Sequence, residues 1–256
     1  MSETLLYELT EGVAVLTLNR PAVMNALSAE LRRSLGAALS RASAEAGVIV
    51  LTGAGRGFCS GQDLTDVDLA TVDLQAILRD EYEPLLTAIV DCPVPVIAAV
   101  NGAAVGAGAG LALACDVVIA SEAASFAQSF TRIGLVPDAG GTYWLPRQVG
   151  LARAMGAMLF GDRISARQAA EWGMIWEAVP EAGFSAHWRA RARALVAGPA
   201  IAYQGVKQAL RASFSNDFNT QLALEARLQG ICGASDDFRE GVAAFLEKRP
   251  ARFQGR

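Results

Sequence analysis

Histidine and cysteine are scarce in this 256-residue sequence, which has one histidine, His187, and four cysteines, none of them in a Cys-x-x-Cys pair. Zinc and iron–sulfur sites need clusters of these residues, and a Ser-His-Asp or Cys-His mechanism needs a histidine beside the nucleophile. His187 lies in an arginine- and alanine-rich stretch that is typical of a helix surface or packing position. The sequence therefore favours a protein without a metal site, a disulfide framework or a histidine-activated nucleophile.

Other shortages narrow the class of protein further. The formal net charge is −4 and the basic residues are scattered, which argues against nucleic-acid binding. The first residues, Met1–Thr4, lack the basic and apolar regions of a signal peptide. Unpaired thiols are typical of a reducing compartment, so we expect a cytoplasmic protein.

Charged residues are absent between Cys92 and Cys115, a stretch long enough to cross a membrane. Two prolines and a run of glycines interrupt it, however. These breaks favour a buried strand at 94–100, a Gly/Ala-rich turn and a tightly packed helix at 106–114. We therefore expect no membrane span.

Strand and helix patterns alternate through the first two thirds of the chain. Residues 5–9 and 13–18 predict a hairpin, and Ser28 is expected to cap the helix that follows. The other expected elements are strands at 48–51, 94–100, 116–120 and 176–179, and helices at 74–90, 106–114 and from 165 to near 173. This order predicts an α/β fold with parallel strands joined by right-handed crossovers.

The pattern beyond residue 182 is almost entirely helical. The helices after residue 197 are too few to form a core alone, so they must pack on the preceding part of the chain or on another subunit. We therefore predict a core of residues 1–196 that carries the functional site, and a helical oligomerisation region of residues 197–256.

Acidic residues are also rare in the middle of the chain, where residues 92–161 contain only Asp116, Glu122 and Asp138. Asp138 stands in an apolar run, with a proline before it and two glycines shortly after it. Burial raises the pKa of such a carboxyl group and makes it a usable proton shuttle. The alternative is an N-cap of the next helix, and the two roles do not exclude each other.

Two glycine-rich segments, Gly53–Leu64 and Asn101–Gly110, are the other prominent features. The first does not match a nucleotide P-loop, and the second comes too late in the chain to be a convincing dinucleotide motif. One main-chain N–H group from each segment could converge on a carbonyl oxygen, the second at a helix N-terminus, to form an oxyanion hole. Close packing of strands and helices by small residues is the alternative.

Four ordered motifs resemble the crotonase (enoyl-CoA hydratase/isomerase) superfamily over nearly the whole chain. They are Asn19–Leu27, Gly55–Leu64, Asn101–Gly110 and Gly134–Gly141, and the segment Gly241–Phe253 also fits the family's C-terminal tail. The resemblance implies acyl-CoA thioester chemistry in a crotonase-like ββα spiral with a C-terminal helical trimerisation region. Trimers, often paired into hexamers, are expected, and no cofactor is implied because CoA is part of the substrate.

The resemblance also implies the site residues. In this family two main-chain N–H groups polarise the thioester carbonyl and stabilise an enolate, and here they would belong to Gln62 and Ala107. The implied CoA- and substrate-binding positions are Met24, Ala26, Leu27, Ser60, Gly61, Gln62, Asp63, Leu64, Gly106 and Phe130, together with Phe245 and Lys248 from the tail. In the family the tail residues sometimes come from a neighbouring subunit.

Departures from the family pattern point to one branch. The hydratases hold a water between two glutamates, but the matching positions here are Gly110 and Phe130, whose side chains cannot move a proton. Asp138 matches a position that is acidic in the 4-chlorobenzoyl-CoA dehalogenase branch and in the ring-isomerising branch. The dehalogenase also uses a His and a Trp, but the Trp position holds Phe130 and His187 lies far outside the matching region, which leaves the ring-isomerising branch. That branch converts ring-1,2-epoxyphenylacetyl-CoA to oxepin-CoA in phenylacetate degradation, and it shifts an acyl-CoA double bond from the 3,4 to the 2,3 position. We therefore predict an acyl-CoA isomerase in which Asp138 is the single acid.

Two other functions are left open. A hydratase could recruit another acid, Asp80 or Glu81, from the expected helix at 74–90. The chain could also be a non-catalytic acyl-CoA binder.

Overall fold

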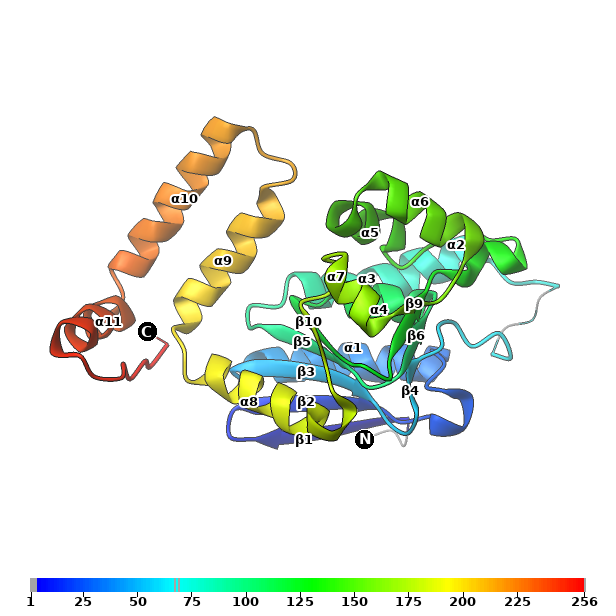
Figure 1. The fold of residues 1–256 in the computed structure, drawn as a ribbon, viewed down its shortest axis with the longest axis horizontal. Helices are drawn as coiled ribbons and strands as arrows, with labels where there is room; N and C mark the ends of the chain where they lie inside the picture. Colours follow the sequence, from blue (N-terminus) through cyan, green and yellow to red (C-terminus); the bar gives the residue numbers. More distant parts are fainter. Residues whose placement is uncertain (1–3, 67, 69, 256) are drawn as a thin grey trace.

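A six-stranded sheet forms the centre of the protein, whose computed structural model describes residues 4–66, 68 and 70–255 (Figure 1). The strand order is β1-β2-β3-β5-β7-β10, with bounds β1 Leu5–Thr10, β2 Val13–Leu18, β3 Val48–Gly53, β5 Val96–Val100, β7 Val117–Ser121 and β10 Glu177–Val179. β1 and β2 are antiparallel, and every later neighbour in the sheet is parallel. The α/β class and the parallel strands expected from the sequence are confirmed.

The hairpin between β1 and β2 turns at Glu11 and Gly12, which both have positive φ angles, of 51° and 77°. Two consecutive left-handed residues give the type I′ geometry whose twist matches that of the flanking strands. The hairpin predicted from the alternating sequence is confirmed.

A second, smaller sheet was not predicted. It joins four short strands in the order β4-β6-β8-β9, with bounds β4 Gly57–Cys59, β6 Ala103–Val105, β8 Ser125–Ala127 and β9 Ile164–Ser165. The chain repeatedly runs through a strand of the large sheet, a strand of the small sheet and then a helix. The turn expected after residue 100 therefore contains β6, and the repeating unit is ββα.

The helices of the core lie on the inner side of the large sheet, some on its face and others on the helices next to it (Figure 1). Their bounds are α1 Ala29–Glu45, α2 Leu74–Ile77, the π-helical turn η2 Leu78–Tyr82, α3 Glu83–Val90, α4 Ala107–Ala114, α5 Gly141–Val149, α6 Leu151–Phe160 and α7 Ala166–Glu171. Ser28 caps α1 as predicted, because its side chain accepts a hydrogen bond from Leu31 N–H, and Ser165 caps α7 in the same way, accepting from Gln168 N–H. The predicted helix at 74–90 is confirmed, with a π-helical turn in its middle.

The C-terminal helices leave the core one after another. α8 (Phe184–Val196) packs on the outer face of the large sheet, where Trp188 and Ala192 are buried with Val50 and Ile97. α9 (Ala200–Ala212), α10 (Phe218–Gly233) and α11 (Asp236–Glu247) then project from one end of the molecule as an arm (Figure 1). The division of the chain at residue 196 stays a prediction.

One partly buried ion-pair cluster ties the arm to the core. Asp116, just before β7, pairs with Lys207 and Arg211 of α9, each at 2.6 Å. Lys207 also donates to Val94 O at 2.8 Å. Within residues 4–66, 68 and 70–255, no helix has the length and apolar character that a membrane crossing requires.

Candidate active site

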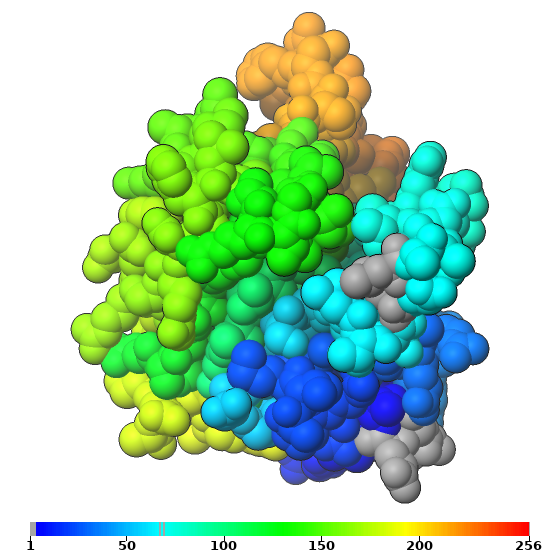
Figure 2. Space-filling model, turned by 90° about the vertical axis from the view of Figure 1, so that its right-hand side faces the viewer, coloured from blue at the N-terminus to red at the C-terminus, as the bar shows by residue number. Residues whose placement is uncertain are grey.

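Two segments far apart in the sequence form one wall of the candidate site. Leu27 N–H donates to Gly61 O (2.8 Å) and Asp63 N–H donates to Leu27 O (3.3 Å), which makes a parallel bridge between Leu27 and Gln62. In such a bridge the intervening residue turns its own N–H away from the partner, so Gln62 N–H faces away from Leu27. Figure 2 shows these segments, coloured blue and cyan, side by side on one face of the molecule.

Asn25 organises this wall although the sequence analysis did not single it out. Its side chain is fully buried, and Nδ2 donates to the carbonyl oxygens of Ala54, Gly57 and Phe58. Met24 and Asn25 both have left-handed backbone conformations, with φ angles of 50° and 58°. Such strain in non-glycine residues persists only where surrounding contacts impose it, and it is concentrated at functional sites.

The other implied CoA-binding residues on this wall differ in their hydrogen bonds and in their exposure to solvent. Ser60 N–H donates to Met24 O (2.9 Å) and its hydroxyl to Val23 O (3.0 Å). Ala26 and Leu27 are buried, whereas Leu64 is half exposed. Hydrogen bonds from Thr65 lower the pKa of Asp63, and burial opposes this effect. The ion pair with Arg20, at 2.7 Å, lowers the pKa further. Asp63 is therefore held as a structural carboxylate.

The second oxyanion candidate, Ala107, lies opposite the first. A Cβ added at Gly61 would stand 2.8 Å from Val105 O and 3.4 Å from Ala107 N, so the two glycine-rich segments are in contact. Ala107 is the first residue of α4, after Gly106 with φ 55°. The N–H groups of a first helical turn have no acceptor inside the helix and carry its positive end. The structure thus brings Gln62 and Ala107 together at a helix N-terminus.

Close packing by small residues, the alternative explanation for the glycines, is also present. A Cβ at Gly108 would lie 2.3 Å from Cys59 O, so α4 can approach β4 only because residue 108 is glycine. The glycines therefore serve two purposes, since the packing of Gly108 is what brings the two loops near each other.

Asp138 follows η3 (Ser129–Ile133) and precedes α5 on a loop beside α4. Its Oδ1 is buried and has no hydrogen-bond partner among the described residues. Burial raises the pKa of Asp138 from 3.8 to about 6. Ala139, next to it, has a φ angle of 48°, a strained conformation for a residue with a side chain. A strained loop thus holds an unsatisfied, half-buried carboxyl group.

The N-cap hypothesis for Asp138 is wrong. The capping residue of α5 is Gly140, with φ 77°, and no side chain caps the helix. Gly141 N–H donates to the main-chain oxygen of Asp138 at 2.8 Å, which closes a turn and leaves the carboxyl group out of it. Because two left-handed residues, Ala139 and Gly140, separate Asp138 from α5, the Asp138 side chain does not cap the helix.

The two positions that match the hydratase glutamates carry no ionisable side chain. Gly110 packs against the backbone of Ala139, since a Cβ there would meet Ala139 O at 2.4 Å. Phe130 is buried, and its ring lies 3.5 Å from the position of a Cβ on Gly106. Neither position therefore offers a second proton-transfer group to the site.

The alternative acids of the 74–90 helix are both engaged elsewhere. Glu81 accepts two hydrogen bonds from the buried Arg32, at 2.7 and 3.0 Å. Asp80 is exposed and pairs with Arg79, whose hydrogen bond lowers the pKa of Asp80. Neither carboxyl group has an unpartnered buried oxygen such as Oδ1 of Asp138.

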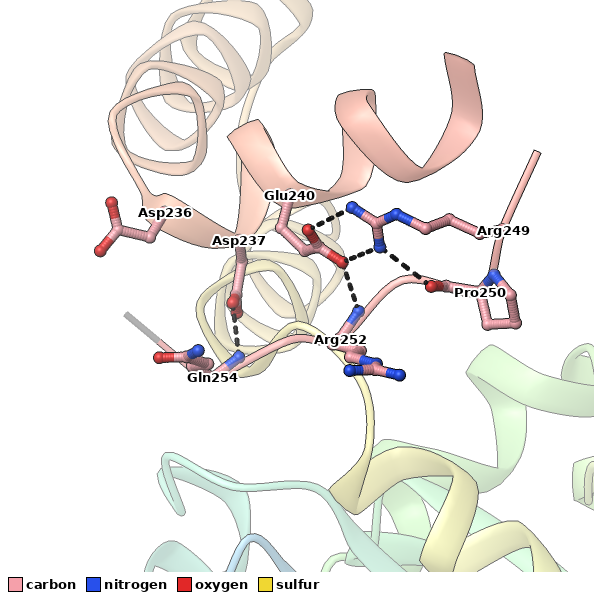
Figure 3. A pocket seen from close by; sticks show the side chains of 7 residues that line it. All are labelled: Asp236, Asp237, Glu240, Arg249, Pro250, Arg252 and Gln254. Atoms are coloured by element: carbon pink, nitrogen blue, oxygen red, sulfur yellow. Dashed lines mark hydrogen bonds and ion pairs between the residues drawn. The ribbon is translucent and has the colours of Figure 1, made fainter. Parts of the chain in front are cut away.

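The implied tail residues, Phe245 and Lys248, lie on the arm, away from these loops (Figure 1). Phe245 is 83% exposed, and Lys248 ends α11 with a left-handed φ of 55°. The residues that follow fold back on α11 around a pocket of about 680 Å³, where Glu240 binds Arg249 and Asp237 accepts from Gln254 N–H (Figure 3). Within one chain, Phe245 and Lys248 are not brought to the site.

Two buried side chains beside Gln62 were not predicted from the sequence. They are Arg32 and Tyr82. Arg32 had a usable signal, because positions 32, 35, 39 and 42 form the buried stripe of α1 and a charge on such a stripe needs a partner. Tyr82 had none, since an aromatic residue in a predicted helix is usually a packing residue. Among the described residues, no cluster of three His, Cys, Asp or Glu side chains could hold a metal ion.

Comparisons with known proteins agree with this architecture. The family model described as enoyl-CoA hydratase/isomerase matches residues 8–256. A Rhodobacter capsulatus protein named probable enoyl-CoA hydratase is 64% identical, with 99% of this chain and 98% of the relative covered. Escherichia coli 1,2-epoxyphenylacetyl-CoA isomerase is 44% identical over the full length of both chains. The crystal structure of Bacillus anthracis enoyl-CoA hydratase, 33% identical, has a TM-score of 0.91 over 99% of this chain and 100% of its own. The expected crotonase-like fold is confirmed.

Proposed function

Because the chain belongs to the enoyl-CoA hydratase/isomerase family of enzymes, we propose that it is an acyl-CoA isomerase in which Asp138 moves the proton. Gln62 N–H and Ala107 N–H bind the thioester oxygen. The observation that carries this proposal is the Asp138 carboxyl group, which has an unpartnered buried oxygen and a pKa raised to about 6 by burial.

The proton path needs one base. The two N–H groups stabilise negative charge on the thioester oxygen, which makes a proton on C2 of the acyl group acidic. Asp138 takes that proton and leaves a dienolate when the substrate has a 3,4 double bond. The same carboxylic acid then returns the proton to C4, and the double bond ends between C2 and C3. No atom is gained or lost, so neither water nor a redox cofactor enters the balance.

The raised pKa suits this double task. A carboxylate with a pKa near 4 is a poor base at neutral pH, whereas a group titrating near the working pH can both take and return a proton. Burial disfavours the charged form of Asp138 and so keeps its pKa raised. Gly110 and Phe130, at the two hydratase positions, supply no water-activating group, and this supports the isomerase role.

For the physiological substrate we propose ring-1,2-epoxyphenylacetyl-CoA, which is rearranged to oxepin-CoA in phenylacetate degradation, with the 3,4- to 2,3-enoyl shift as a second activity. The support is the name of the Escherichia coli relative, 1,2-epoxyphenylacetyl-CoA isomerase, at 44% identity, together with the single acid. The more similar Rhodobacter capsulatus relative carries the name of a hydratase, which favours a second candidate.

That second candidate is an enoyl-CoA hydratase. Asp138 would have to activate water and also supply the proton for the α-carbon, because Glu81 is bound to Arg32 and Asp80 is exposed to solvent. A non-catalytic acyl-CoA binder is the third candidate, and it would leave the strain and the raised pKa beside the oxyanion donors without a purpose.

We further propose that the enzyme needs no cofactor beyond the CoA of its substrate, and that it is cytoplasmic. It would assemble as a trimer or a dimer of trimers, in which Phe245 and Lys248 reach the CoA bound to a neighbouring subunit. The support is the exposure of these residues on an arm that lies away from the chain's own site.

The test compares the wild type with Asp138→Asn, which removes the proton-transfer group and keeps its shape. Oxepin-CoA formation and the 3,4- to 2,3-enoyl shift are measured alongside hydration of crotonyl-CoA. We expect kcat for isomerisation to fall by about 1,000-fold or more, with CoA-ester binding retained. Isomerase activity within a few-fold of wild type would sink the proposal. Robust hydration with no isomerisation favours the hydratase, and tight binding without any turnover favours the binder.

A further inference from the structure

The side chain of Gln62 is held by a buried network that the proposed chemistry does not itself use. The hydroxyl group of Tyr82 donates to Gln62 Oε1 at 2.6 Å, and Arg32 donates to the same oxygen at 2.9 Å. Gln62 Nε2 donates to Asp63 O at 3.2 Å. The amide oxygen therefore has two donors and the amide nitrogen has an acceptor, which fixes the orientation of the whole side chain.

Arg32 is itself fixed. Its guanidinium group is 3% exposed, donates to Leu27 O at 2.6 Å and pairs with Glu81 at 2.7 Å. It also lies over the ring of Tyr82, 5.0 Å from the centroid. A buried charge is costly unless it is paired and hydrogen-bonded, so this arrangement has little freedom to relax.

The network joins three parts of the chain at the first oxyanion donor. Arg32 comes from α1, and Tyr82 comes from the π-helical turn of the 74–90 helix, a type of irregularity that is frequent at functional sites. Gln62 lies between the two main-chain bonds that tie Gly61 and Asp63 to Leu27. Its N–H therefore has a main-chain anchor on each side and a side-chain anchor at Tyr82.

We propose that Tyr82 is a positioning residue, which holds Gln62 so that its main-chain N–H stays aimed at the thioester oxygen. This inference rests on the proposed function. The 74–90 helix would then be coupled to the reaction, since Tyr82 is its link to the donor. Loss of the hydroxyl group leaves Gln62 Oε1 with Arg32 alone and lets the 60–63 segment shift.

The charge state of Tyr82 suits a permanent donor. Burial, with a contribution from the nearby Asp138 carboxylate, raises the pKa of Tyr82, and the cation of Arg32 only partly opposes this. The hydroxyl group therefore keeps its proton throughout the pH range in which Asp138 titrates. Tyr82 is thus hydrogen-bonded to the residue that carries one oxyanion donor and lies within electrostatic range of the proposed base.

The experiment uses Tyr82→Phe, which keeps the ring over Arg32 and removes only the hydroxyl group. Complete loss of an oxyanion donor costs about 100- to 1,000-fold in kcat, so a displaced donor should cost about 10- to 50-fold, with KM changed less than threefold. Tyr7→Phe is the matched control, because Tyr7 donates to Glu45 on the far side of α1 and its loss should leave kcat within twofold.

A double-mutant cycle tests whether Tyr82 acts through Gln62. Gln62→Leu removes the acceptor and keeps the main-chain N–H, so adding Tyr82→Phe to it should lower kcat by less than threefold further. The inference is overturned if Tyr82→Phe leaves kcat within twofold of wild type, if it changes only KM, or if it costs the same factor with and without Gln62. Gln62→Leu also tests the bond from its other end, should Tyr82→Phe unfold.

A readout that needs no turnover separates this inference from the isomerase assignment. A 3-ketoacyl-CoA is acidic at C2, and its enolate absorbs in the near ultraviolet, so the enolised fraction of bound ligand reports the oxyanion donors directly. We expect Tyr82→Phe to lower the bound enolate-to-keto ratio about 10-fold, even if the wild type shows no isomerase activity. An unchanged ratio in Tyr82→Phe refutes the positioning role while leaving the isomerase proposal intact.

Discussion

The α-carbon of Gly110 faces the carbonyl oxygen of Ala139 so closely that a Cβ on residue 110 would lie 2.4 Å from it. The backbone next to Asp138 thus occupies the space in which a side chain of α4 would stand. A glutamate at 110, as in the hydratases, and this conformation of the 138–141 loop are mutually exclusive. The absence of a side chain at residue 110 is therefore what permits this placing of Asp138.

Gly110→Ala should destabilise the protein. The added methyl group meets backbone rather than a flexible side chain, so α4 or the Asp138 loop must move, and we expect the free energy of unfolding to fall by about 1–3 kcal/mol. Urea unfolding measures this. Gly36→Ala in α1 is the control, because a Cβ there has no neighbour within 4 Å and should stabilise by about 0.5–1 kcal/mol. Equal effects at both positions would contradict the close approach.

The isomerase rate should depend on the ionisation of Asp138. A base must be unprotonated to take the C2 proton, and burial raises the pKa of Asp138 to about 6. We expect kcat/KM to be level above pH 7 and to fall about tenfold per pH unit well below pH 6. A midpoint near the ordinary aspartate value, or a profile unchanged in Asp138→Asn, would show that another group limits the rate.

Asp138→Asn should also stabilise the protein at neutral pH. A carboxyl group whose pKa is raised on folding binds more protons in the folded than in the unfolded state between pH 3.8 and 6, so stability falls as pH rises through that window. Allowing for partial solvent screening, we expect a gain of about 1–2 kcal/mol at pH 7.5 and none at pH 4, because asparagine stays neutral.

Urea unfolding at the two pH values measures this difference. Asp162→Asn is the control, since Asp162 is exposed and its pair with Arg132 is 3.2 Å long. A gain of the same size at both pH values would mean that the benefit comes from packing or hydrogen bonding and not from charge.

Local signals account for what the sequence predicted correctly. The β1–β2 hairpin, the Ser28 cap and the 107–114 helix each depend on residues within one turn or one strand pair. The short strands of the second sheet do not. A three-residue strand such as β6 is defined by its partners β4 and β8, which lie more than a dozen residues away in both directions, and its own sequence resembles a turn.

The site divides in the same way. Asp138 stood out because acids are rare around it, and the glycine loops stood out by composition. The cap hypothesis failed because Ala139 adopts a left-handed conformation, which moves the helix start beyond Asp138. An alanine disfavours that conformation, so it follows from the packing of Ala139 against α4 and could not be predicted from the local sequence. Tyr82 was missed because its role exists only through Gln62 and Arg32, 20 and 50 positions away.

The exposed apolar surface of the arm predicts self-association. Large apolar side chains of α9 to α11 are exposed, among them Leu210, Phe214, Phe218, Leu246 and Phe245. The core has a second apolar surface, a pocket of about 660 Å³ lined by residues 134–137 and by Met155 and Leu159. Two different apolar surfaces on one chain favour a head-to-tail contact, which closes into a ring when the rotation allows it.

We expect light scattering after size-exclusion chromatography to give three or six times the mass of one chain. Leu246→Glu, at a position 73% exposed on the arm, should lower that mass, because a buried unpaired charge in an interface is costly. The control is Leu6→Glu, half exposed on β1 and outside the arm, which should leave the mass unchanged. If the wild type were monomeric, Phe245 and Lys248 could not reach the CoA of a neighbouring subunit. Neither residue would then belong to the proposed substrate site.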